Sequence, residues 1–101
     1  MPLTCIITTS KPDNVPFFPN ASLENLGMIQ DINDWTKSQP GFISREFTNP
    51  DENTVVVTVV FDTVNNYIDW RTNHFNLPGV QLRAAYNAAN GITSVVTESI
   101  T

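Results

Sequence analysis

The stretch Thr54-Val-Val-Val-Thr-Val-Val-Phe61 is the most regular segment of the chain. Six of its eight residues are apolar and all but Phe61 are β-branched, which is typical of a β-strand. The nearly continuous apolar run predicts burial on both faces of a sheet. A second strand is predicted over 42–48. The short turn 49–53 joins the two, so they are expected to form an antiparallel hairpin.

Two further strands are predicted at the ends of the chain, over 3–9 and 92–100, because both stretches are rich in β-branched residues. The loop after the first strand contains three prolines and is expected to be irregular. It carries Phe17 and Phe18, which predict either a flap over the core or a lid over a pocket.

The helices are predicted from caps and apolar spacing. The first is expected to begin at Asn20 or Ser22 and to stop before Pro40. The second helical region begins at Asp62-Thr63, breaks near 73–77 and restarts at Pro78. Residues expected to face the core are Leu26, Met28, Ile29, Ile32 and Trp35 in the first helix, Val64, Tyr67 and Ile68 in the second, and Val80, Leu82, Ala85, Tyr86 and Ala89 in the third.

The resulting order, β-α-β-β-α-β, predicts an α+β, ferredoxin-like fold with a four-stranded antiparallel sheet and one domain over 1–101. Both helical regions then cover the same face of the sheet. The strands carry apolar residues at both alternating positions, for example Ile6 with Ile7 and Val95 with Val96. We therefore expect a second copy to cover the other face, giving a homodimer with packed sheets.

Charge and composition narrow the classes of partner. The 101 residues include 5 basic and 10 acidic side chains, a net charge of −5. The basic residues are scattered, which argues against a nucleic-acid or anionic membrane surface as partner. No apolar run approaches the ~20 residues of a membrane span. The single cysteine, Cys5, allows no intrachain disulfide, and residues 1–4 lack the features of a secretory signal, so a cytoplasmic protein is expected.

The stretch Gln39-Pro40-Gly41-Phe42-Ile43-Ser44-Arg45-Glu46-Phe47, with the strand and aromatic helix after it, resembles antibiotic biosynthesis monooxygenase (ABM) domains. The resemblance implies a dimeric α+β barrel. It also implies a cofactor-independent monooxygenase, an oxidoreductase acting on a planar aromatic, polyketide or quinol-type substrate. Phe61, Tyr67 and Arg83 stand near the positions of pocket residues in that family. The family's strand-end Trp is Phe61 here, and an expected Asn is Val57.

The residue types suggest roles for a candidate site. Arg83, on an otherwise apolar helix, suits an anionic group of the substrate, and it would lower the substrate's pKa so that a carbanion forms and reacts with oxygen. Tyr67 is a candidate hydrogen-bonding partner, and His74, the sole histidine, is a candidate general base. The predicted catalytic residues are Arg83, Tyr67 and His74, and the predicted substrate-binding residues are Phe61, Trp70, Tyr86 and Trp35. No metal site and no cofactor are expected.

Several alternatives remain open. The aromatic residues can serve as core packing alone, and Arg83 can extend its charge to solvent. The chain can be a non-catalytic protein that binds a small molecule or a partner, or a non-oxidative isomerase or cyclase. Trp70 and His74 also resemble residues of the haem-degrading branch of the family. Thr8 or Thr9 stands where that branch has a pocket Asn, which leaves haem as a lesser alternative.

Overall fold

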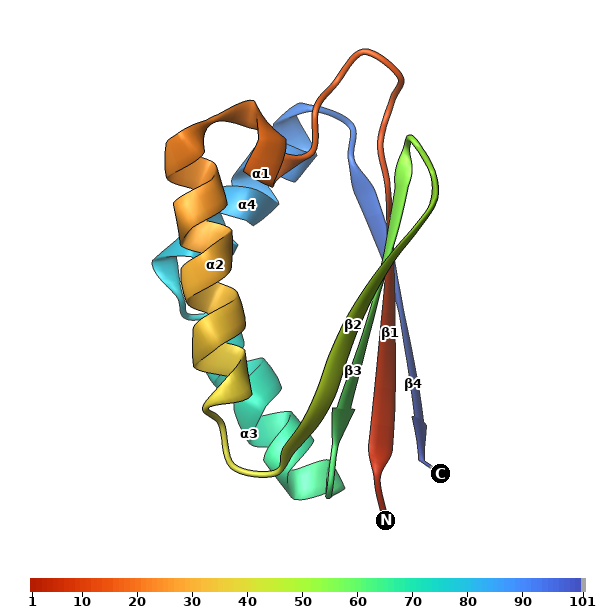
Figure 1. Ribbon diagram of the computed structural model, residues 1–101, viewed down its shortest axis with the longest axis vertical. Helices are drawn as coiled ribbons and strands as arrows, with labels where there is room; N and C mark the ends of the chain where they lie inside the picture. The colour runs from red at the N-terminus through yellow and green to blue at the C-terminus, as the bar shows by residue number, and fades with distance from the viewer. Residues whose placement is uncertain (101) are drawn as a thin grey trace.

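The computed structural model describes residues 1–100 and contains a four-stranded antiparallel sheet with helices on one side (Figure 1). The strand order is β2-β3-β1-β4. The predicted ferredoxin-like α+β fold is confirmed. The elements are β1 (Leu3–Ser10), α1 (Phe18–Ala21), α2 (Leu23–Lys37), β2 (Phe42–Asp51), β3 (Thr54–Phe61), α3 (Val64–His74), α4 (Pro78–Ala89) and β4 (Thr93–Ile100).

The residues predicted to begin and end the helices lie at helix ends in the structure. Ser22 Oγ accepts a hydrogen bond from the Asn25 N–H (3.0 Å) at the start of α2, and Thr63 Oγ1 accepts from the Asn66 N–H (3.2 Å) at the start of α3. Pro78 lies in the first turn of α4, where its missing N–H costs no helical hydrogen bond. Gly91 follows α4 with a φ of 70°, a conformation that favours glycine.

Two sequence predictions about the helical layer are wrong. The proline-rich loop contains a short helix, α1, because Pro19 lies in its first turn, where proline is tolerated. Some residues expected to face the core are exposed instead: Leu26 by 39%, Ile68 by 49% and Leu82 by 50%, together with Ala85 and Ala89. The helices therefore bury narrower stripes than apolar spacing suggested.

The core is divided into two clusters. One lies between the sheet and α3 and consists of Leu3, Cys5, Val59, Phe61, Tyr67 and Trp70. The other joins α1, α2 and α4 and consists of Phe18, Ile29, Ile32 and Val80. In Figure 1, α3 lies against one end of the sheet and α1 and α4 lie at the other end of the helical layer, while α2 runs along the layer from α1 toward α3.

A β-bulge decides which residues of β2 face the helices. The register shifts between Phe42 and Ser44. Phe42 pairs with Phe61, and Arg45 pairs with Val59, so both lie on the helix-facing side of the sheet. The opposite face carries Ile6, Val56, Val60 and Val95 among threonines and serines. It is less apolar than the sequence suggested, although β4 is exposed along its whole length. None of the helices in the described part of the chain could span a membrane.

Candidate functional site

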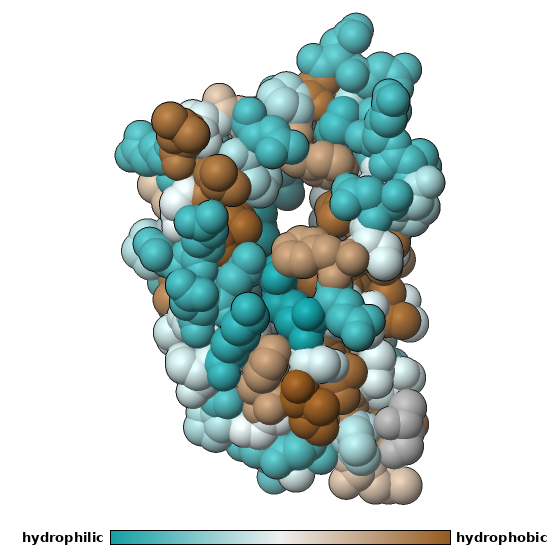
Figure 2. Space-filling model, in the orientation of Figure 1, coloured by the Kyte–Doolittle hydropathy of each residue, from teal (hydrophilic) through white to brown (hydrophobic). Residues whose placement is uncertain are grey.

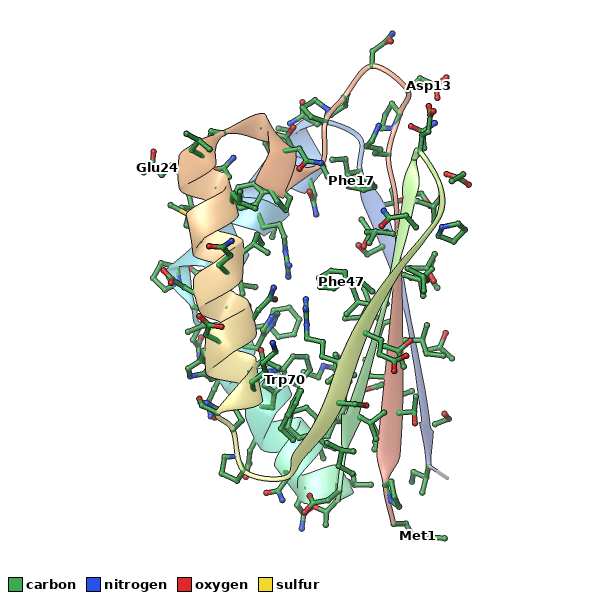
Figure 3. The ribbon with its side chains drawn as sticks, in the orientation of Figure 1. Met1, Asp13, Phe17, Glu24, Phe47 and Trp70 are labelled. Carbon is green, nitrogen blue, oxygen red and sulfur yellow. The ribbon has the colours of Figure 1, made fainter. Side chains whose placement is uncertain are left out.

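A cavity of about 660 Å³ lies between the helical layer and the sheet. Figure 2 shows an opening between the two layers on the viewed face. Strands β1–β4 and helices α1–α4 all contribute to its wall. A cavity of this size is in the range of sites for drug-sized molecules. In Figure 3, Phe47 projects from β2 into the space between the layers, and Trp70 lies at its α3 end.

The floor of the cavity is the helix-facing side of the sheet, and its residues form rows across the strands. One row runs Arg45, Val59, Cys5, Glu98 from β2 to β4. The next runs Phe47, Val57, Ile7, Val96. Neighbouring strands are ~4.8 Å apart, so each row spans roughly 14 Å. The second row supplies an apolar surface to the cavity. In the first row Val59 and Cys5 are only 1% exposed and belong to the core with Tyr67 and Trp70, and the charged residues Arg45 and Glu98 stand at its two ends.

Two arginines line this cavity without an acidic partner. The guanidinium of Arg45 lies 4.2 Å from the centroid of the Phe47 ring. Among residues 1–100, neither Arg45 nor Arg83 forms a salt bridge or a hydrogen bond through its guanidinium. Burial, and then the charge of Arg83, lowers the pKa of Arg45 to about 10, and burial lowers the pKa of Arg83. An arginine guanidinium is charged at neutral pH, so the cavity holds two unpaired cations.

His74 ends α3 and lines the same cavity. Its ring lies 4.8 Å from that of Trp70 and 6.4 Å from that of Trp35, measured between centroids. Burial first, then the charges of Arg83 and Arg45, lower the pKa of His74 to about 4. The imidazole is therefore neutral near pH 7 and can accept a proton. The indole of Trp70 donates to Thr36 Oγ1 at 3.1 Å, which fixes α3 against α2.

A polar cluster lies at the other end of the first row. The Tyr67 hydroxyl donates to Glu98 Oε2 and lies 3.5 Å from Cys5 Sγ. Glu98 also accepts from Arg71 at 3.3 Å, in a partly exposed salt bridge. Burial is the largest cause that raises the pKa of both Tyr67 and Cys5, so both keep their protons at neutral pH.

The structure brings four of the seven predicted site residues together at the cavity: Arg83, Tyr67, His74 and Trp70. The other three do not line it. Phe61 is fully buried in the core, with its ring centroid 5.3 Å from that of Trp70. Trp35 lies behind His74. The hydroxyl of Tyr86 donates to the Pro16 carbonyl at 2.7 Å, and so attaches the proline-rich loop to α4.

The loop after β1 also contributes to the cavity. Phe17 and Phe18 both line it. Lys11 donates to Asn53 Oδ1 at 2.9 Å and lies 5.4 Å from the Phe17 ring. The loop is thus attached to the β2–β3 hairpin on one side and to α4 on the other, across one end of the cavity.

Sequence reasoning missed Arg45, Phe47 and Glu98. In strict alternation from Phe42, Arg45 and Phe47 would face away from the helices, and only the bulge places them inside. Glu98 opposes Cys5 across β1 and β4, a register that the sequence did not reveal. The signal available for Arg45 was a lone arginine in an aromatic strand of a chain with only five basic residues.

Comparison with known proteins supports the fold. The chain is 17% identical to SnoaB, a cofactor-independent oxygenase from Streptomyces nogalater, with a TM-score of 0.63, covering 99% of this chain and 92% of SnoaB. A proposed antibiotic biosynthesis monooxygenase from Deinococcus radiodurans is 16% identical to the chain, with a TM-score of 0.66. The match covers 98% of this chain and 91% of that protein. Rv0793 from Mycobacterium tuberculosis is 14% identical to the chain, with a TM-score of 0.67, and the match covers 100% of this chain and 95% of Rv0793.

No protein-family model and no curated protein sequence matches the chain. The solved structures nevertheless extend over nearly all of it. The resemblance to ABM-like proteins is therefore confirmed at the level of the fold.

Proposed function

We propose that the protein binds a planar aromatic anion in this cavity and oxidises it with molecular oxygen, as a cofactor-independent monooxygenase. The observation that carries the proposal is the pair of unpaired guanidinium groups, Arg45 and Arg83, beside the neutral imidazole of His74. Arg45 and Arg83 are partly buried, and unpaired cations held away from water are costly unless a ligand supplies the opposite charge. The apolar second row of the sheet suits a fused-ring system between them.

The chemistry follows from these groups. The arginine cations stabilise the negative charge that spreads onto a ring oxygen when the methylene carbon between two aromatic rings loses its proton, and so lower the pKa of that carbon. His74 takes the carbon-bound proton. The carbanion passes an electron to O₂, and the two radicals combine to a peroxide anion that His74 protonates. Loss of water then gives the ketone, so R₂CH₂ and O₂ become R₂C=O and H₂O.

Substrate binding would also prepare the base. The neighbouring arginine charges lower the pKa of His74 in the empty cavity. An anion between the arginines offsets those charges, so the pKa of His74 rises and the imidazole becomes a stronger base. Base strength is thereby coupled to occupation by the correct ligand.

The proposal is tested by oxygen consumption with 1,8-dihydroxyanthrone as substrate and by the mass of the product. We expect uptake of one O₂ per ketone formed, with a rate that Arg83→Met lowers at least tenfold. Lys37→Met, an equal change of charge on an exposed residue, is the control. Tight binding without uptake would favour a non-catalytic binding protein, and a product of unchanged mass would favour an isomerase or cyclase.

We further propose that the protein is a cytoplasmic homodimer joined through the outer face of the sheet. Val95 is exposed by 67% and Ile6 by 36% on that face, and burial of such residues against a second copy stabilises a dimer. Ile6→Glu would place a charge in this interface. We expect sedimentation to find a dimer for the parent and a folded monomer for the variant, and a monomeric parent would refute the proposal. The free thiol of Cys5 fits a reducing compartment.

A further inference from the structure

The Tyr67 hydroxyl has one proton and two candidate acceptors. One is the carboxylate of Glu98, and the other is the thiol of Cys5 at 3.5 Å. A carboxylate is a much stronger acceptor than a thiol sulfur, so the proton is directed to Glu98. Cys5 keeps its own proton, since burial raises its pKa.

Glu98 is well placed to hold this proton. It lies on β4 directly opposite Cys5 in the sheet register, and Arg71 donates to the same carboxylate oxygen at 3.3 Å. Arg71 orients the carboxylate from the exposed side. Tyr67 itself is 2% exposed and lines the cavity, so the cluster reaches from solvent to the cavity wall.

We propose that Glu98 is a positioning residue that makes Tyr67 a hydrogen-bond acceptor toward the cavity. With its proton directed to Glu98, Tyr67 offers a ligand only lone pairs. The ligand group that fits here is a hydroxyl donor, such as a second phenol, rather than a carbonyl. The inference rests on the proposed function for the aromatic class of ligand. It adds the requirement that the ligand carry a hydroxyl donor at the end of the row opposite Arg45.

The geometry also suits a ligand with two polar ends. Arg45 and Glu98 terminate the same row, roughly 14 Å apart along the backbone. A linear three-ring ligand with hydroxyls at opposite ends would lie over Val57 and Ile7, which line the cavity, because Val59 and Cys5 in the row between Arg45 and Glu98 are buried in the core. One hydroxyl, as phenolate, meets the arginines, and the other donates to Tyr67.

The first test needs no ligand. The chain has two tyrosines, so in a Tyr86→Phe background the Fermi doublet in the Raman spectrum reports Tyr67 alone. In this background we expect the doublet intensity ratio of a tyrosine that is a strong hydrogen-bond donor. The ratio should shift to that of a non-donor in Glu98→Leu and shift part of the way in the isosteric Glu98→Gln. Glu46→Gln, which removes a carboxylate on the opposite face of the sheet, should leave the ratio unchanged. An unaltered ratio in both Glu98 variants would overturn the proposal.

The second test measures binding without turnover. The dissociation constants of two ligands are compared, 2,6-dihydroxyanthraquinone and its mono-methyl ether. The two ligands differ only in the second hydroxyl. We expect the parent protein to prefer the dihydroxy ligand by roughly three- to tenfold, the value of one hydrogen bond, and Glu98→Leu to lose that preference. An equal preference in both proteins would contradict the inference. If the preference behaves as expected but no anthrone consumes oxygen, only the oxygenase proposal fails.

Discussion

Replacing Arg83 with methionine should move the pKa of His74 upward by a limited amount. Three causes lower that pKa from 6.5 to about 4: burial is the largest, Arg83 second and Arg45 third. Arg83 therefore accounts for at most half of the difference, and Arg45 for at most a third. With burial preserved by methionine, we expect the pKa of His74 to rise at most about half of the way back to 6.5 in Arg83→Met and at most about a third of the way in Arg45→Met.

The assay is an NMR titration of the imidazole, which is clean because the chain has one histidine. Lys37→Met removes an equal charge elsewhere and should leave the pKa unchanged. If His74 titrates near 6.5 in the parent protein, the imidazole is not buried beside the arginines. If Lys37→Met raises the pKa as much as Arg83→Met, the effect is general and the two arginines do not act on His74 specifically.

Three other perturbations test the scaffold around the site. Thr36→Val leaves the buried Trp70 N–H without its acceptor and should lower the free energy of unfolding in urea by about 1–3 kcal/mol; an unchanged value would refute this bond. Gly41→Ala should cost more than about 2 kcal/mol in thermal unfolding, because φ is +80° and a Cβ would lie 2.2 Å from Asp62 Oδ1; a neutral effect would contradict that backbone geometry. Because the pKa of His74 is lowered to about 4 on folding, the unfolded chain binds more protons between pH 4 and 6.5. The free energy of unfolding should therefore fall by at most about 3 kcal/mol as pH drops through that range, and His74→Gln should show a smaller fall; equal falls would exclude His74 as the cause.

The fold could be predicted from local signals, since these are strong where they matter. The β-branched run at 54–61 and the caps at Ser22 and Thr63 all have the predicted roles. Helix faces were predicted less well. Ile68 and Leu82 follow the apolar spacing but are exposed, because apolar spacing does not show how wide a stripe of a helix its neighbours cover.

The site depends on features that a periodic pattern does not contain. The bulge between Phe42 and Ser44 reverses the side of the sheet on which Arg45 lies. Glu98 meets Tyr67 only through the pairing of β1 with β4 and the placement of α3. Both features depend on tertiary structure. Arg83, in contrast, could be identified from the sequence because it is a charged residue on an otherwise apolar helix.

The binding of an anion between Arg45 and Arg83 is the claim on which the proposed function depends. Alizarin tests it directly, because its neutral form is yellow and its monoanion is red. At a pH where free alizarin is neutral, we expect the protein to bind it with the spectrum of the anion, and the Arg45→Met, Arg83→Met double variant to lose that spectrum. A neutral spectrum on binding to the parent, or the anionic spectrum retained in the double variant, would contradict the account.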